Sequence, residues 1–139
     1  MALMTRPTPD PVSDQPGFLM HRLAFARRIA GTGYPFDEDA SRALALEEAK
    51  RAFDPAGTAR QITAIAVTGD RRSRLATISV RTLVIHGADA PLFLPACGQD
   101  TAKVIPKAEF MLIDGMGHDL PASLLPLIID AIDRNARRA

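Results

Sequence analysis

The sequence predicts an incomplete α/β fold, in which helices come first and a strand–helix–strand–helix unit follows. Two short apolar runs, 81–86 and 108–113, each stop at a glycine-containing turn, and the first of them is rich in β-branched residues. A continuous apolar run suits a strand that is covered on both faces. A helical segment, 96–105, separates the runs, and another, 120–137, follows them. Because a helix joins the two strands, they should form a parallel pair.

Helices are also expected ahead of the strands, where the chain shows helical periodicity together with capping and helix-stopping residues. Gly31 ends the first helix, Asp37 caps the second, and Pro55 suits the first turn of the third. The stretch 62–67 is also compatible with a strand. The expected helices are 18–30, 37–52, 55–69 and a short basic one at 71–76.

Three segments are therefore expected along the chain. Residues 1–17 are rich in proline and polar residues, which favours a disordered tail, and the alternative is that a longer domain was cut here. Residues 18–77 should form a helical cap or lid, because their helices do not alternate with strands. Residues 78–139 should form the α/β core segment.

Composition argues against several classes of protein. The 139 residues include 17 basic and 16 acidic side chains, a net charge of +1, and no long basic run, so nucleic acid is not an expected partner. No apolar stretch is long enough to cross a bilayer, and residues 1–16 lack the apolar centre of a signal peptide. The single cysteine, Cys97, cannot form an internal disulfide. A cytoplasmic location without membrane contact is expected.

The strongest signal for chemistry is the segment Gly115-Met116-Gly117-His118-Asp119. It follows the second predicted strand, and ligands of open α/β sheets bind at the carboxyl ends of strands. Imidazole titrates near neutrality, so His118 can act as a general base and then as a general acid. The alternative is a loop histidine that only hydrogen-bonds to backbone.

A second signal stands at the end of the first predicted strand, in the segment His86-Gly87-Ala88-Asp89-Ala90-Pro91-Leu92. A carboxylate here would lie beside the loop that holds His118. Such a carboxylate fixes the tautomer of an imidazole and stabilises its cation. The alternative is that Asp89 is only a turn residue.

Taken together, these segments resemble the closing third of an α/β-hydrolase. The strand-end segments 81–87 and 115–121 carry the resemblance, and an acid that precedes the histidine is the chain order of that superfamily. Segments 33–38 and 56–61 are similar to the helical cap of the aclacinomycin methylesterases and proline iminopeptidase-like hydrolases. The resemblance covers about residues 18–134, and it implies a small-molecule ester as substrate.

The resemblance also implies roles for individual residues. His118 matches the catalytic histidine, and His86 and Gly87 match a structural strand-end pair. The catalytic aspartate of such enzymes stands directly before the loop proline, where this chain has Ala90. Alanine can neither accept a proton nor orient an imidazole. Two interpretations stay open: Asp89, one residue earlier, swings in as a displaced acid, or the acid function is lost or impaired.

The serine nucleophile of α/β-hydrolases sits in a Gly-x-Ser-x-Gly turn between a strand and a helix. No serine in this chain stands in that pattern; the serines are Ser13, Ser41, Ser73, Ser79 and Ser123. The oxyanion loop and the earlier strands of the family are missing as well. The chain is therefore expected to begin where the cap begins.

Other candidate sites are weaker. Cys97 opens a predicted helix, and nothing marks an activated thiolate. The segment 31–33 lacks the preceding strand that a phosphate loop needs. The histidines show no metal-ligand spacing, so neither a metal nor a cofactor is expected; they are His21, His86 and His118.

Two functions from different classes remain. In the first, the chain is the C-terminal half of a serine ester hydrolase, active when it is joined to a complementing N-terminal chain. In the second, it is a non-catalytic remnant or binding module that keeps the fold fragment. Because a two-stranded sheet leaves unpaired edges, self-association, a partner chain or partial disorder is expected.

Overall fold

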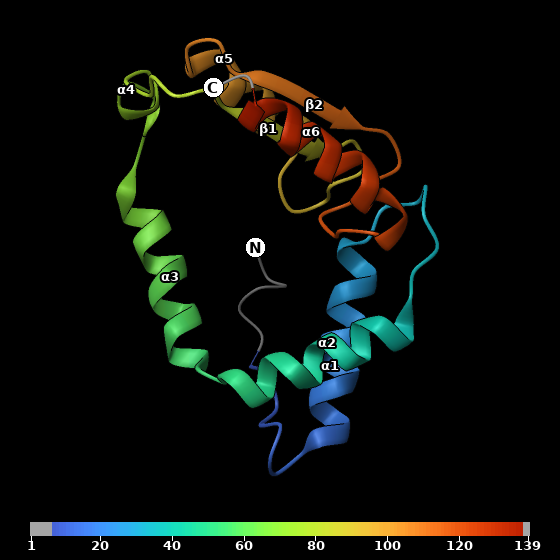
Figure 1. Cartoon of the computed structure of the whole chain (residues 1–139). Coiled ribbons are helices and arrows are strands. Elements are labelled where there is room, and N and C mark those ends of the chain that lie inside the picture. The colour runs from blue at the N-terminus through green and yellow to red at the C-terminus, as the bar shows by residue number, and fades with distance from the viewer. Residues whose placement is uncertain (1–6, 138–139) are drawn as a thin grey trace. The chain divides into compact units, whose positions relative to one another are not determined.

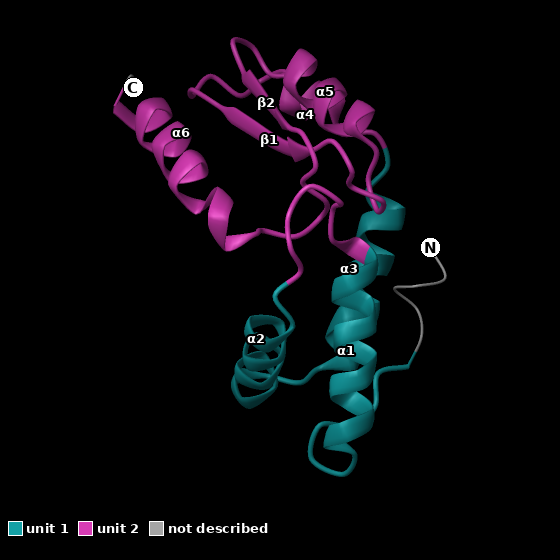
Figure 2. Ribbon diagram, turned by 90° about the vertical axis from the view of Figure 1, so that its right-hand side faces the viewer, with its two compact units in different colours: residues 1–28, 37–69 teal, residues 29–36, 70–139 magenta. Residues whose placement is uncertain are grey.

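The computed structural model describes residues 7–137, which divide into two compact units (Figure 2). Unit 1 comprises Met1–Arg28 and Asp37–Gly69, and unit 2 comprises Ile29–Phe36 and Asp70–Ala139. Residues 1–6, part of the predicted tail, lie outside the described residues. The division gives the short segment between the first two helices to the unit that holds the strands.

Unit 1 is built on three helices, α1 (Gln15–Ile29), α2 (Glu38–Arg51) and α3 (Pro55–Thr68) (Figure 1). The last two begin at aspartates whose side chains accept backbone N–H groups, as capping residues do. Asp37 and Asp54 each accept one such bond at 2.8 Å. The predicted second and third helices are confirmed, and the ambiguous stretch 62–67 is helical.

Helix α1 begins three residues earlier than the sequence predicts. The carboxylate of Asp14 accepts a hydrogen bond from the Gly17 N–H at 2.9 Å, and its carbonyl accepts one from the Phe18 N–H at 2.9 Å. This capping places Pro16 in the first turn, where a missing N–H is tolerated. Residues 11–17 therefore form a turn and a helix start, where a disordered tail is predicted.

The interior of unit 1 is small. Its buried apolar side chains are Phe18, Leu23 and Ala45, and Phe18 meets Phe53 edge to face with ring centroids 6.0 Å apart. Helix α3 contributes no buried residue, and its Ile65 is exposed. Unit 1 thus keeps an apolar helix surface that its own residues do not cover.

Unit 2 is organised around a parallel pair of strands, β1 (Leu83–Gly87) and β2 (Glu109–Ile113), which confirms the predicted pairing. Helix α5 (Pro95–Val104) connects them, and the short helix α4 (Arg72–Leu75) precedes β1. In the register of the pair, Ile85 lies opposite Met111 and His86 lies opposite Leu112. Within residues 7–137 the sheet holds these two strands alone.

Alternation of side chains gives the sheet two faces. Ile85 and Met111 pack against a buried cluster that includes Ile128 of the last helix, α6 (Leu125–Arg137). On the other face, Gly98 of α5 lies against the ring of His86, so closely that an added Cβ would be 2.7 Å from its Cδ2. Helices α6 and α5 therefore cover opposite faces, and the strands lie between them (Figure 2).

The last helix is shorter than predicted. The sequence predicts a helix over 120–137, but α6 begins only at Leu125, after a 3-10 turn at Ala122–Leu124. Pro121 and Pro126 account for the difference, because proline lacks an N–H and disfavours helical backbone in the residue before it. Pro126 is accordingly the second residue of α6. Like the other helices within residues 7–137, α6 lacks the length and apolar character needed to cross a bilayer.

The apolar arc of α6 is wider than the surface that covers it. Ile128 is buried, whereas Leu125, Ile129 and Ile132 are exposed and form a second stripe at i, i+4, i+7 spacing. Two strands about 4.8 Å apart are too narrow to cover both stripes of a helix that is about 10 Å wide. Part of the apolar surface of α6 is therefore not covered by other residues of unit 2. We call Leu125, Ile129 and Ile132 the outer α6 stripe.

Candidate functional site

His118 lies in the loop that follows β2, at the carboxyl end of the strand, as the sequence predicts. Its backbone N–H donates to the carbonyl of Ile29, the last residue of α1, at 2.7 Å. Its side chain is exposed. The backbone of the candidate base is thus fixed, while its imidazole remains open to solvent or to a ligand.

Glycines let three backbone segments approach one another beside His118. A Cβ added at Gly117 would lie 2.2 Å from the nitrogen of Gly31 and 2.3 Å from the carbonyl oxygen of Ile29. A Cβ added at Gly87 would lie 2.2 Å from the carbonyl oxygen of Gly117. No side chain larger than hydrogen fits at these positions. We call this contact of segments 29–33, 87–90 and 115–119 the glycine junction.

Backbone hydrogen bonds close the glycine junction. The Gly33 N–H donates to the carbonyl of Gly115 at 3.0 Å, and the Asp89 N–H donates to the carbonyl of Met116 at 2.9 Å. With the bond from His118 to Ile29, they tie the histidine loop to both neighbouring segments. Three backbone hydrogen bonds to two different segments make the junction a fixed feature rather than a loose loop contact.

In the glycine junction, Asp89 is hydrogen-bonded to Thr32 and not to His118. Its Oδ2 accepts the Thr32 N–H at 3.0 Å and the Thr32 hydroxyl at 2.5 Å. These two donors, the hydroxyl first, lower the pKa of Asp89. Within residues 7–137 no hydrogen bond or ion pair joins Asp89 to His118. Its role as a displaced acid stays a prediction.

Ala90 occupies the position that the resemblance gives to the catalytic aspartate. It is only 3% exposed, and its N–H donates to the carbonyl of Gly87 at 3.3 Å. A buried methyl group therefore stands where a carboxylate is expected. Within the described part of the chain, the ring nitrogens of His118 have no hydrogen-bond partner.

An open pocket of about 480 Å³ lies against His118. It is bounded by the end of β1, the start of α5 and the histidine loop. Its lining residues include Arg71, Val84, Phe93, Cys97 and Met116. A largely apolar wall that also carries the imidazoles of His86 and His118, the guanidinium of Arg71 and the carboxylate of Asp119 can hold a small apolar molecule beside a proton acceptor.

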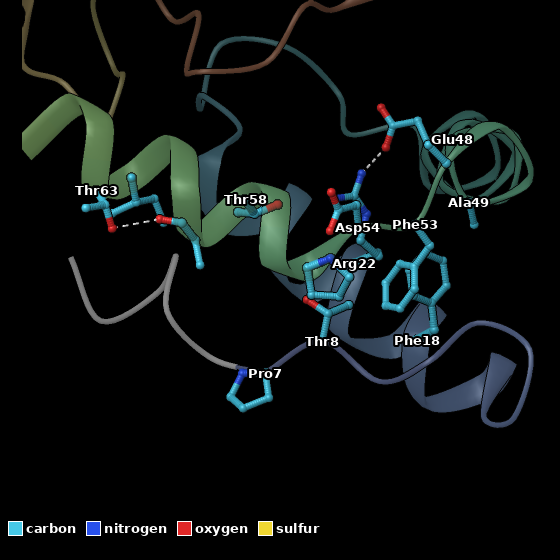
Figure 3. A pocket seen from close by; sticks show the side chains of 14 residues that line it. Pro7, Thr8, Phe18, Arg22, Glu48, Ala49, Phe53, Asp54, Thr58 and Thr63 are labelled. Atoms are coloured by element: carbon cyan, nitrogen blue, oxygen red, sulfur yellow. Dashed lines mark hydrogen bonds and ion pairs between the residues drawn. The ribbon is translucent and has the colours of Figure 1, made fainter.

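A second pocket, of about 510 Å³, lies in unit 1 (Figure 3). Phe53 forms part of its apolar wall, and an ion pair joins Arg22 to Glu48 at one side. Asp54 caps α3, and its pKa is lowered above all by the backbone N–H of Gly57. Asp54 pairs with Arg60, so the carboxylates of this pocket are each engaged with an arginine, and no histidine or cysteine stands among the described residues that line it. This pocket therefore lacks a proton acceptor suited to catalysis near neutrality.

Two residues of the His118 site escape the sequence analysis. Thr32 belongs to a segment that reads only as a helix stop, yet it anchors Asp89, 57 positions away. Phe93 reads only as a loop residue, yet its ring lies 5.6 Å from the imidazole of His118. Periodicity reports on neighbours along an element, so contacts between distant loops leave no such signal.

Replacing Thr32 by valine should weaken the glycine junction in a pH-dependent way. A lowered folded-state pKa stabilises the fold above the unfolded value, and this contribution is lost as the pH falls through the folded value. The wild-type urea midpoint should therefore drop as the pH falls below about 4, the ordinary pKa of an aspartate. Thr32→Val, without the hydroxyl, should show a shallower drop, and the exposed Thr58→Val should match the wild type. If the urea midpoint falls equally steeply with pH in all three proteins, the Asp89–Thr32 contact does not stabilise the junction.

No protein-family model matches the chain. Solved structures do share its fold. The esterase RhEst1 from Rhodococcus sp. ECU1013 matches 92% of this chain with a TM-score of 0.61 and 18% identity. Est816, described as an N-acyl homoserine lactone degrading enzyme, matches 95% with a TM-score of 0.53 and 20% identity. The hydrolase olei00960 from Oleispira antarctica matches 94% with a TM-score of 0.53 and 22% identity.

The chain spans about half the length of these proteins, 45% of RhEst1 and 52% of each of the other two. At such low identity the likeness shows a shared fold, and activity does not follow from fold alone. It confirms the predicted resemblance at that level. The chain has an α/β-hydrolase-like fold that corresponds to about half of each of these longer proteins.

Proposed function

We propose that the chain is the C-terminal part of an α/β-hydrolase that cleaves carboxylic esters, with His118 as its general base. The observation that carries the proposal is the loop after β2, where the glycine junction holds the backbone of His118 beside an apolar pocket. Open α/β sheets place their active sites at this edge. The likeness of fold to an esterase and a hydrolase supports the same reaction class.

The proposed reaction is acyl transfer followed by hydrolysis. His118 takes the proton of a serine hydroxyl as the serine oxygen attacks the ester carbonyl, and returns it to the departing alcohol. Water then cleaves the acyl-serine, with His118 again as the base. No serine of the 139 residues stands in Gly-x-Ser-x-Gly, so the proposal assigns the nucleophile and the oxyanion hole to a segment outside them.

The rate expected for this hydrolysis depends on whether a carboxylate pairs with His118. In the proposal Asp89 stays with Thr32, and Ala90 leaves His118 without a carboxylate partner. When the acid of a serine triad is lost and the wrong tautomer results, turnover drops by about 10⁴. We therefore expect slow hydrolysis even with a serine in place, unless another group orients the imidazole.

The proposed partner is a complementing α/β segment. Each strand of a two-stranded sheet has one edge of unpaired N–H and C=O groups, which a further strand can pair with. The outer α6 stripe offers an exposed apolar surface for such a segment to cover. Self-association through the same surfaces is the alternative. Light scattering of the purified chain distinguishes a monomer from a self-associated form.

A second candidate is a non-catalytic module that keeps the fold. The observation in its favour is the buried alanine at position 90, which removes the group that orients the base. The reading frame upstream of the Met1 codon separates the two candidates. A frame that encodes Gly-x-Ser-x-Gly after a strand supports the hydrolase, and a neighbourhood without one supports the module.

The chain by itself is expected to show no esterase turnover, because a general base without a nucleophile or an oxyanion hole gives only a small share of the rate. The measurement is hydrolysis of p-nitrophenyl acetate by the purified chain and by His118→Ala. Both rates should equal that of free imidazole at the same concentration or lie below it. A rate well above imidazole that His118→Ala abolishes would place the nucleophile within these residues.

A further inference from the structure

The aromatic ring of Phe93 lies beside the imidazole of His118. The ring of Phe93 lies with its centroid 5.6 Å from that of the imidazole, at an interplanar angle of 52°. This is within the range of attractive aromatic contacts, which favour tilted and edge-to-face geometries. The ring nitrogens themselves have no hydrogen-bond partner within residues 7–137.

Phe93 contributes little to the core of unit 2. It stands between β1 and α5, and it is 48% exposed. An exposed phenyl ring forgoes part of the free energy that burial would give, about 25 cal/mol for each Å² left in water. A packing role does not account for this placement, whereas a contact with the imidazole does.

The resemblance suggests two positions for a group that orients the histidine, 89 and 90. Neither residue hydrogen-bonds to His118 within residues 7–137. Asp89 accepts its hydrogen bonds from Thr32, and Ala90 has only a methyl group. The backbone of His118 is held by Ile29, which fixes the position of its Cα but leaves the ring torsions free. The χ2 torsion of histidine is broad unless something restricts it.

We propose that Phe93 is the positioning residue of His118: its ring restricts the imidazole in place of the carboxylate that Ala90 does not supply. The catalytic consequence rests on the proposed function of His118 as a general base. The contact itself does not, so it can be measured in the chain alone. The aromatic ring sets the direction of the imidazole, but it accepts no proton and fixes no tautomer.

The test is an NMR comparison of His118 in the full chain and in three variants at Phe93 and its neighbour. Ring currents of Phe93 shift the Hδ2 and Hε1 resonances of a nearby imidazole. In Phe93→Leu these resonances should move to the positions of an exposed histidine, and in Phe93→Tyr they should stay near the wild-type values. Leu94→Ala, at another exposed residue of the same loop, is the matched control and should change neither resonance.

Reactivity gives a second readout of the same contact. Carbethoxylation of His118 by diethyl pyrocarbonate should be severalfold faster in Phe93→Leu than in wild type, Phe93→Tyr or Leu94→Ala. Unchanged resonances and rate in Phe93→Leu, with an unchanged circular dichroism spectrum, would overturn the proposal. Equal changes in Leu94→Ala would do the same, because they would point to the loop as a whole.

Once a serine-bearing segment is supplied, the separate effects of Phe93→Leu on kcat and KM distinguish a positioning residue from a substrate contact. Misplacing a catalytic group lowers kcat, so Phe93→Leu should lose about tenfold or more in kcat with KM nearly unchanged. A rise in KM with kcat unchanged would make Phe93 a substrate contact and overturn the proposal. If no hydrolysis is found, the proposed function fails, while the NMR result still decides whether Phe93 orients the ring.

Discussion

Gly117→Ala is expected to destabilise unit 2 so strongly that the histidine loop loses its native structure. The added Cβ would meet the nitrogen of Gly31 at 2.2 Å and the carbonyl oxygen of Ile29 at 2.3 Å. Both atoms belong to backbone and cannot rotate aside, so the segments must separate. Separation breaks the 2.7 Å bond between His118 and Ile29. We expect a loss of about 3 kcal/mol or more in the free energy of unfolding.

A matched substitution separates this clash from the general cost of replacing glycine. Gly69 has a positive φ of 68°, but an added Cβ would meet nothing within 4 Å. Gly69→Ala should therefore cost about 1 to 3 kcal/mol, from its backbone conformation alone, because φ 68° with ψ −154° is essentially restricted to glycine. Urea unfolding followed by circular dichroism gives both values. A loss in Gly117→Ala no larger than that in Gly69→Ala would mean that the three segments do not pack as described.

Ile128→Ala is expected to cost about 2–5 kcal/mol, since it empties a buried position between α6 and the sheet. Ile129→Ala, on the outer α6 stripe, is the matched control: it removes the same atoms from a side chain that is 61% exposed. In the monomeric chain that change should stay within about 0.5 kcal/mol. The difference arises because Ile128 is buried in unit 2, whereas most of the Ile129 side chain stays in water.

The same pair of variants tests whether the outer α6 stripe is an interface. If a complementing segment covers the stripe, Ile129→Ala should weaken the assembly while leaving the isolated chain unchanged, with sedimentation as the measurement. Equal losses for Ile128→Ala and Ile129→Ala in the isolated monomer would show that both faces of α6 are already packed within the chain.

The secondary structure was predictable where local physical rules decide it. The apolar runs at 81–86 and 108–113 have the composition of buried parallel strands, and they became β1 and β2. Asp37 and Pro55 are capping and first-turn residues whose preference does not depend on distant contacts. The start of α6 was missed, because its apolar periodicity continues across Pro121 and hides the break that the prolines impose.

The candidate site was predictable only in part. Position relative to a strand end is a local property, so His118 could be placed at the edge of the sheet from sequence. The partner of Asp89 could not, because Thr32 approaches it from the end of α1 and no spacing rule links the two. The close approach of Gly31 to Gly117 was equally hidden, since a glycine that ends a helix and a glycine that admits another backbone look alike in sequence.

The central claim is that His118 acts as the general base for a serine carried by a complementing segment. The most direct measurement is hydrolysis of p-nitrophenyl acetate after co-expression of this chain with an α/β segment that carries Gly-x-Ser-x-Gly. We predict slow turnover that depends on both partners and falls by about 10² when His118 is changed to alanine or the serine of the segment is changed to alanine, because the loss of the acid has already removed part of the triad's contribution. Turnover that survives His118→Ala unchanged, or an assembled complex without turnover, would contradict the claim.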